Sequence, residues 1–122
     1  MSVGEQNSNP VTYSYKTVHG EDILADVYFP IGDSNSMPAL VYIHGGCLMY
    51  GSRKGIHPEQ LEIYRRAGYT VISIDYRLAP ETKLAEIIAD IREGFRWVAE
   101  VGPQRFGIDP EHIAVVGHSA GG

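Results

Sequence analysis

The sequence predicts an α/β fold, with an antiparallel first hairpin followed by parallel strands and flanking helices. Short, nearly continuous apolar runs at Ala39–Ile43, Tyr69–Ile74 and Ile113–Val116 are typical of strands buried on both faces. Helical patterns alternate with these runs. Such β-α-β-α-β alternation indicates a parallel sheet with helices on its two faces.

The N-terminal part predicts a leader and a hairpin. Residues 1–10 are polar, so we expect a disordered leader followed by one partial domain over residues 11–122. The strand formers of Val11–Val18 and the apolar segment Ile23–Phe29 predict two strands. The polar residues His19–Asp22 between them predict the turn of a hairpin.

Two helices are predicted between the later strands. Pro58–Ala67 begins with proline and is followed by glycine, the usual order of start and stop signals. Thr82–Val101 is the longer helix, and we expect Gly102-Pro103 to end it. Its apolar residues recur at helical spacing and indicate a face turned to a core. They are Leu84, Ile87, Ile88, Ile91, Phe95 and Val98. A turn is expected over Phe106–Glu111, because it holds a glycine and an Asp-Pro pair.

Composition excludes several classes of function. The chain has 122 residues, which is at most one domain. Hydrophobic residues make up 43% and charged residues 20%, a balance typical of globular proteins. Its formal charge of −5 argues against nucleic acid and anionic membrane as partners. No apolar run is long enough to cross a bilayer, and no secretory signal is visible. With Cys47 as the single cysteine, we expect a reducing, cytoplasmic setting.

The strongest chemical motif is a Gly-x-Ser-x-Gly pentapeptide at Gly117–Gly121, directly after the strand Ile113–Val116. In a nucleophile elbow the serine sits on a tight, strained turn that exposes its hydroxyl, so the flanking residues must be small. Ser119 is therefore the candidate nucleophile. By itself the pentapeptide is only moderate evidence, because a glycine-rich loop of a globular domain also fits it.

A second glycine-rich turn, His44-Gly45-Gly46-Cys47, follows the strand Ala39–Ile43. Backbone N–H groups at the end of a strand can donate to an oxyanion, and the cysteine side chain does not remove such a donor. Alone, the turn is better explained by a need for positive φ. Together with the elbow, in this chain order, it predicts an oxyanion loop.

A third segment, Asp75–Glu81 with the sequence DYRLAPE, follows the strand Tyr69–Ile74. We expect its charged pair, Asp75 and Arg77, to brace the loops beneath the site. No metal-ligand spacing, phosphate loop or dinucleotide fingerprint is present, so no metal and no cofactor is expected.

These motifs together resemble the α/β-hydrolase fold, and within it the hormone-sensitive-lipase-like carboxylesterases. The resemblance covers Val11 to Gly122 and rests on HGG with a following GS, DYRLAPE and FGIDPEHIAVVGHSAGG. It implies a cofactor-free serine hydrolase of short acyl esters, acting through an acyl-Ser119 intermediate. It implies an oxyanion hole from the backbone N–H groups of Gly46, Cys47 and Ala120, with His44 as a structural residue of the loop.

Two positions depart from the family pattern. The family often has a third glycine where Cys47 stands, and a kynurenine-formamidase-like branch has HGG-x-W, where this chain has Leu48. The elbow has His118 where the lipase-like branch often has Asp. The choice between ester and amide substrates therefore stays open.

The proton acceptor for the serine is not visible in the chain. In the resembled fold the order is nucleophile, acid, histidine, whereas all five histidines here precede Ser119. Of these, only His44 is expected near the site. We therefore expect the chain to be the N-terminal part of a larger hydrolase, truncated after the elbow and inactive by itself. The alternative is a non-catalytic fragment that acts in an oligomer or complementing complex, because the last strand would leave an open sheet edge for another copy.

Overall fold

The computed structural model describes residues 10–31, 37–46 and 49–117. The expected leader lies almost entirely outside these residues. The described strands and helices are, in chain order, β1 (Val11–Val18), β2 (Glu21–Tyr28), β3 (Met37–Ile43), the short 3-10 helix η1 (Arg53–Gly55), α2 (Pro58–Arg66), β4 (Thr70–Ile74), α3 (Leu84–Phe106) and β5 (Ile108–Gly117).

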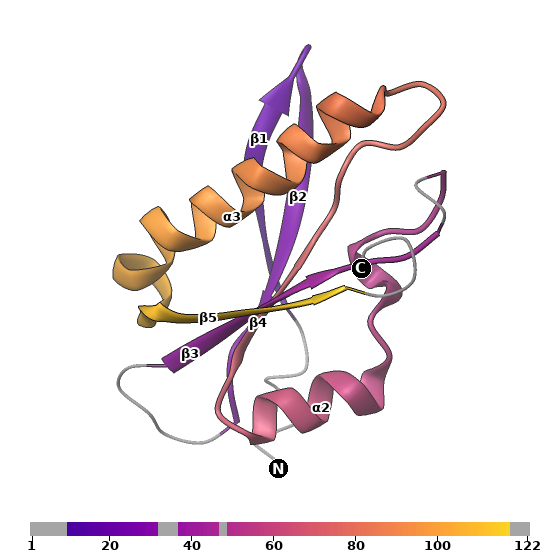
Figure 1. Ribbon diagram of the computed structural model, residues 1–122. Helices are drawn as coiled ribbons and strands as arrows, with labels where there is room; N and C mark the ends of the chain where they lie inside the picture. Colours follow the sequence, from indigo (N-terminus) through magenta and orange to yellow (C-terminus); the bar gives the residue numbers. More distant parts are fainter. Residues whose placement is uncertain (1–9, 32–36, 47–48, 118–122) are drawn as a thin grey trace.

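The predicted α/β class is confirmed. The described strands form one sheet in the order β1-β2-β4-β3-β5. β1 and β2 form the expected antiparallel hairpin, and β2 also pairs antiparallel with β4. β3 pairs parallel with both β4 and β5. Helix α3 covers one face of the sheet and α2 lies on the other, so the fold has three layers (Figure 1).

Alternation along the central strands divides the buried side chains between two cores. On β3, Ala39, Val41 and Ile43 belong to the larger core, which also includes residues of α3. Leu40 and Tyr42 belong to a smaller core, to which residues of α2 contribute. Because both faces of β3 are covered, the strand needs apolar residues at every position, which is why the sequence showed a continuous run.

A β-bulge in β1 changes which side chains reach α3. Ser14 pairs with Leu24 and Lys16 pairs with Ile23, so Tyr15 is an extra residue on β1. A bulge of this kind shifts the alternation of the strand. Tyr15 consequently packs in the core that includes residues of α3, and Lys16 pairs with Asp90 of α3, although the two residues are adjacent in sequence.

The predicted end of the long helix was wrong. α3 continues through Gly102 and Pro103 to Phe106, and Gly107 caps it in the left-handed conformation, with φ of 70°. Proline has a helix-compatible φ and removes only one backbone donor, here within the last turns. Gly102 is buried against Ile108, where an added Cβ would lie 2.8 Å from Cδ1 of that isoleucine. Packing of this last turn outweighs the local stop signal.

The predicted buried face of α3 was also partly wrong. Leu84 and Ile88 are 58% and 43% exposed. The other four predicted residues do pack on the core: Ile87 and Val98 are fully buried, and Ile91 and Phe95 are partly buried. The remaining buried positions of α3 are Asp90, Gly94, Gly102 and Phe106. The glycines on this face allow a close approach that bulky side chains would prevent.

The last strand begins earlier than predicted. β5 starts at Ile108, and its register against β3 shifts between the pairs Met37–Ile108 and Ala39–Ile113. The expected Asp-Pro turn lies within this irregular stretch, where Asp109 Oδ1 accepts a hydrogen bond of 3.0 Å from the backbone N–H of Glu111. In the described part of the chain β5 forms one edge of the sheet.

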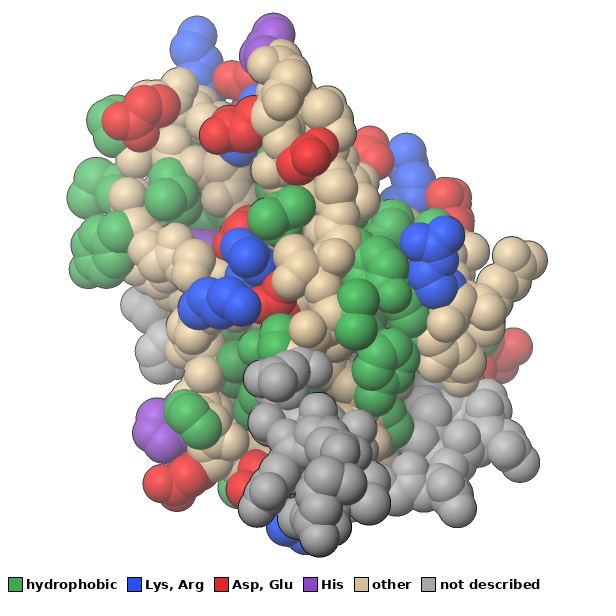
Figure 2. All heavy atoms as spheres, turned by 180° about the vertical axis from the view of Figure 1, so that it is seen from behind, with side chains coloured by type: hydrophobic (Ala, Val, Ile, Leu, Met, Phe, Trp, Pro, Cys, Tyr) green, Lys and Arg blue, Asp and Glu red, His purple; other side chains and the backbone are tan. Residues whose placement is uncertain are grey.

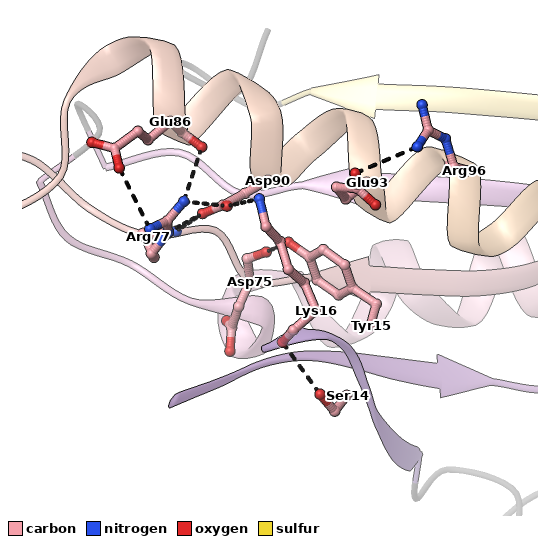
Figure 3. A network of polar contacts seen from close by, with 9 residues as sticks. All are labelled: Ser14, Tyr15, Lys16, Asp75, Arg77, Glu86, Asp90, Glu93 and Arg96. Atoms are coloured by element: carbon pink, nitrogen blue, oxygen red, sulfur yellow. Dashed lines mark hydrogen bonds and ion pairs between the residues drawn. The ribbon is translucent and has the colours of Figure 1, made fainter. Parts of the chain in front are cut away.

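A buried carboxylate ties α3 to the hairpin and to the segment after β4. Asp90 is fully buried, and its Oδ1 accepts from Lys16 Nζ and Arg77 Nη2, both at 2.9 Å. Its Oδ2 accepts from Nε and from the backbone N–H of Arg77, also at 2.9 Å (Figure 3). Burial by itself would raise the pKa of Asp90, but these bonds outweigh it and hold the pKa below its ordinary value.

We expect Asp90→Asn to lower the free energy of unfolding of the purified protein by about 3 kcal/mol, because the substitution leaves the Lys16 and Arg77 cations without their buried partner. Since the folded-state pKa of Asp90 is lowered, its stabilising effect is present above the ordinary carboxyl pKa of about 4 and is lost as the pH falls through the folded value. Denaturant unfolding from pH 7 to pH 3 should show a steeper loss of stability for the wild type than for the variant.

The matched control is Glu93→Gln, the same change on an exposed part of the same helix. Glu93 makes a 3.5 Å ion pair with Arg96, and the two side chains are 42% and 64% exposed. Its loss should change stability by less than about 0.5 kcal/mol. Equal effects of the two substitutions would show that the Asp90 cluster has no special structural weight.

Candidate functional site

The carboxyl ends of three parallel strands meet at one edge of the sheet. Ile43 of β3 is the Cα partner of Ile74 on β4 and of Gly117 on β5. The next residues along each strand are the three motifs found in the sequence. The parallel register therefore brings the HGG turn beside the start of the DYRLAPE segment on one side and beside the start of the elbow on the other.

The structure does not describe every predicted site residue. Those outside the described residues are Cys47, Ser119, Ala120 and Gly121. Gly117 is described as the last residue of β5, so the strand runs to the predicted elbow. The described site residues are His44, Gly45, Gly46, Asp75, Arg77 and Gly117.

His44 is buried beneath the loop that follows β3. Its side chain is only 2% exposed, and its ring stacks on that of Tyr76 with centroids 4.1 Å apart and planes 3° apart. The Tyr76 hydroxyl donates to the His44 carbonyl at 2.8 Å. His44 Nδ1 lies 2.7 Å from the carbonyl oxygen of Gly45, and because a carbonyl only accepts, Nδ1 carries a proton. Nε2 is buried with no hydrogen-bond partner among the described residues.

Two glycines allow the outgoing and returning segments of this loop to touch. Gly46 has φ of 124°, and a Cβ there would lie 1.9 Å from the carbonyl oxygen of Tyr50. Gly51 has φ of 98°, and a Cβ there would lie 2.4 Å from the Gly45 carbonyl oxygen and 2.8 Å from His44 Nδ1. The outgoing and returning segments of the loop are therefore in direct backbone contact.

Arg53 anchors the returning segment to the sheet. Its Nε donates to Asp26 Oδ1 at 2.9 Å, and its Nη1 donates to Asp75 Oδ2 at 2.8 Å. Its backbone N–H donates to Asp75 Oδ1 at 2.7 Å, and its carbonyl accepts from the Ser73 hydroxyl at 2.6 Å. One residue thus connects the loop to β2 and to β4.

Asp26 is a second fully buried carboxylate, on the face of β2 opposite to α3. Besides Arg53, Thr12 donates to its Oδ1 at 2.7 Å, and Lys54 Nζ lies 2.9 Å from Oδ2 as an ion pair whose angle does not make a hydrogen bond. Burial alone would raise the pKa of Asp26, but Lys54, Thr12 and Arg53 outweigh it and lower the pKa. Burial by itself would lower the pKa of Arg53. The hydrogen bonds and charges of Asp26 and Asp75 outweigh burial and raise the pKa of Arg53.

Asp75 and Arg77 do not pair with each other. Asp75 binds Arg53 in the loop, whereas Arg77 binds Asp90 on α3 and lies 3.9 Å from Glu86. The backbone carbonyl of Asp75 also accepts a hydrogen bond from the Tyr15 hydroxyl (Figure 3). The two charged residues of this segment therefore contact different faces of the fold.

A groove of about 450 Å³ opens at the same edge of the sheet. It lies between the start of β2, the returning loop segment and the segment after β4, and its lining includes Glu21, Ser52, Tyr76, Leu78 and Glu81. Figure 2 shows acidic side chains gathered at the end of the molecule where the hairpin turns. A small molecule that reaches this edge would meet a partly apolar groove with an acidic rim.

Sequence reasoning missed Arg53, Asp26, Asp90 and Lys16. A signal was present for the two carboxylates. Asp26 interrupts an apolar strand, and Asp90 lies on the helix face that also carries Ile87 and Gly94, so each predicts a buried charge that needs a cation. The cations themselves could not be chosen among the basic residues of the chain without the structure.

Among the described residues, no group of three or more His, Cys, Asp or Glu side chains is placed to hold a metal ion. None of the helices in that part of the chain is long and apolar enough to span a membrane.

Comparison with known proteins supports an esterase-like fold. A model of the alpha/beta hydrolase fold family matches residues 40–122. The non-reducing polyketide synthase atr1 of Stereocaulon alpinum is 40% identical over 119 residues, which are 91% of this chain and 5% of that protein.

Solved structures agree with this match. The butyrate-bound esterase Est2 of the planctomycete Thermogutta terrifontis superimposes with a TM-score of 0.83 at 28% identity, over 93% of this chain and 41% of the esterase. The same enzyme phosphorylated by paraoxon gives a TM-score of 0.80 at 25% identity, over 96% of this chain and 46% of the esterase.

The chain thus spans less than half of the esterase and a small part of the polyketide synthase. The family model matches more than half of the chain, and the strand order and esterase neighbours agree with it. The chain belongs to the α/β-hydrolase fold family.

Proposed function

We propose that this chain carries the nucleophile and the oxyanion loop of a serine hydrolase that cleaves short acyl esters. The register of β3 with β5 is the observation that carries this proposal. Because Ile43 and Gly117 are Cα partners, the HGG turn and the elbow start from neighbouring positions at one sheet edge. An acyl-transfer site needs this proximity between nucleophile and oxyanion donors.

In the proposed mechanism, the Ser119 hydroxyl oxygen attacks the ester carbonyl carbon while a general base takes its proton. Backbone N–H groups of Gly46, Cys47 and Ala120 donate to the oxyanion of the tetrahedral intermediate. The bond to the alcohol oxygen breaks, and the alcohol leaves with the proton from the base. Water then attacks the acyl-serine and gives a proton to the base, which passes it to the departing Ser119 oxygen as the carboxylic acid is released.

The general base is proposed to be a histidine other than His44. The His44 ring is buried, stacked and bonded through Nδ1 to Gly45, which suits a residue that shapes the loop rather than one that exchanges protons. The chain covers 41% of the esterase, and we place the histidine and its acid partner in the part of the hydrolase fold outside that share.

The polyketide synthase similarity favours acyl thioesters as a second class of substrate. Acyl chains under assembly are commonly held as thioesters, and a serine attacks a thioester carbonyl through the same kind of tetrahedral intermediate. The two candidates use one site and differ in the leaving group.

The nucleophile assignment predicts covalent labelling. The purified protein that contains this chain should gain one diethyl phosphate group on Ser119 when treated with paraoxon, as peptide mass spectrometry would show. Ser119→Ala should abolish labelling and lower p-nitrophenyl butyrate turnover by at least about 1,000-fold. Ser14→Ala, at an exposed serine of β1, should label normally. Labelling that survives in Ser119→Ala would refute the assignment.

The oxyanion loop predicts a strong dependence on Gly46. Gly46→Ala places a Cβ against the Tyr50 carbonyl, so the loop must move, and we expect kcat to fall by about 100-fold, as for loss of one oxyanion donor. Gly20→Ala is the matched control, because Gly20 also has positive φ, of 79°, but no atom within 4 Å of the added Cβ. Steady-state kinetics with similar losses in both variants would contradict this role of Gly46.

The choice of leaving group is tested by one pair of substrates. We expect p-nitrophenyl butyrate and the N-acetylcysteamine thioester of butyrate both to be hydrolysed, with both activities lost in Ser119→Ala. A kcat/KM more than about tenfold higher for the thioester would select the second candidate. Hydrolysis of butyranilide in preference to both would contradict the two candidates and favour an amidase.

A further inference from the structure

We propose that Arg53 is a positioning residue for the oxyanion loop, acting by holding Asp26 and Asp75 at the same time. This inference rests on the proposed function, since it concerns how Gly46 and its neighbours are placed for oxyanion binding. Arg53 touches no reacting atom in this proposal. It acts through the backbone contacts between the two segments of the loop.

Arg53 is held by contacts to β2 and to the end of β4. Its side chain is 19% exposed, and its guanidinium joins Asp26 on β2 to Asp75 just after β4. The backbone N–H of Arg53 also binds Asp75, and its carbonyl binds Ser73 on β4. The main chain of Arg53 is therefore fixed relative to β4 through both its N–H and its carbonyl.

Arg53 lies next to the place where the two segments of the loop touch. Gly51, two residues earlier, packs on the Gly45 carbonyl and on the His44 ring, with no room for a methyl group. The backbone N–H groups of Met49 and Tyr50 donate to the Gly46 carbonyl at 3.0 Å and 3.1 Å. Because the returning segment touches the outgoing one at these points, a displacement at residue 53 is passed directly to Gly45 and Gly46.

The positions of Asp26 and Asp75 around residue 53 require an arginine there. The two carboxylates are bound by different nitrogens of one planar guanidinium, Nε and Nη1. A lysine ammonium is a compact point charge and cannot present two donors in this fixed fork. Lys54 is placed next to Asp26 but its side chain is 58% exposed, and the described residues show no ion pair between Lys54 and Asp75.

The test uses Arg53→Lys in the full protein, with Arg66→Lys as the matched control. Arg66 makes an exposed ion pair with Glu62 on α2, away from the loop. With p-nitrophenyl butyrate, we expect Arg53→Lys to lower kcat about tenfold with KM within about twofold, and Arg66→Lys to change neither. The rate of paraoxon labelling at Ser119 should fall in parallel with kcat, because the phosphoryl oxygen uses the same donors. An unchanged kcat in a folded Arg53→Lys would overturn the proposal.

A double mutant separates positioning from a general loss of stability. If Arg53 acts through Gly46, the kcat of Arg53→Lys/Gly46→Ala should equal that of Gly46→Ala alone. Multiplication of the two single effects would overturn the proposal. If Arg53→Lys does not fold, Asp75→Asn replaces it, since this change weakens the contact of Arg53 with the end of β4 while Asp26 keeps its pairing with Arg53. Wild-type protein that neither turns over esters nor labels at Ser119 would instead overturn the proposed function itself.

Discussion

Two buried carboxylates, Asp26 and Asp90, impose the constraint on which the edge of the sheet that carries the candidate site depends. Each is fully buried, on opposite faces of the sheet, and a buried charge is tolerated only when it is paired and hydrogen-bonded. The arginines that pair with them, Arg53 and Arg77, both lie in segments that follow the parallel strands β3 and β4. Folding of the sheet and placement of the loops at its edge are therefore coupled. Asp26 on β2 and Asp90 on α3 become buried together with the arginines of these loops.

The general architecture could be predicted because it depends on local patterns. The central strands are buried on both faces and leave a continuous apolar run, as in Ala39–Ile43, and the hairpin and α2 carry ordinary turn and capping residues. The parallel class followed from their alternation with helices, and the three motifs identified the family. The structure adds the register in which Ile43 pairs with Gly117, so the HGG turn begins beside the first residue of the predicted elbow.

The remainder depends on tertiary contacts that no local pattern contains. The continuation of α3 through Pro103 is due to packing of Phe106 and Gly102 against the sheet and β5. The partnership of Lys16 with Asp90 depends on the bulge at Tyr15, which one strand alone does not reveal. The DYRLAPE segment does not reveal which residues Asp75 and Arg77 bind, since each finds its partner in another element.

Amide hydrogen exchange tests most directly whether the arginine clamp holds the loop. In the wild type, the amides of Met49 and Tyr50, bonded to the Gly46 carbonyl, should be protected. In Arg53→Lys they should exchange at least about tenfold faster, while amides of the central strand β4 keep their wild-type rates. Equal protection of Met49 and Tyr50 in both proteins would contradict the account, because the loop would then keep its shape without the clamp.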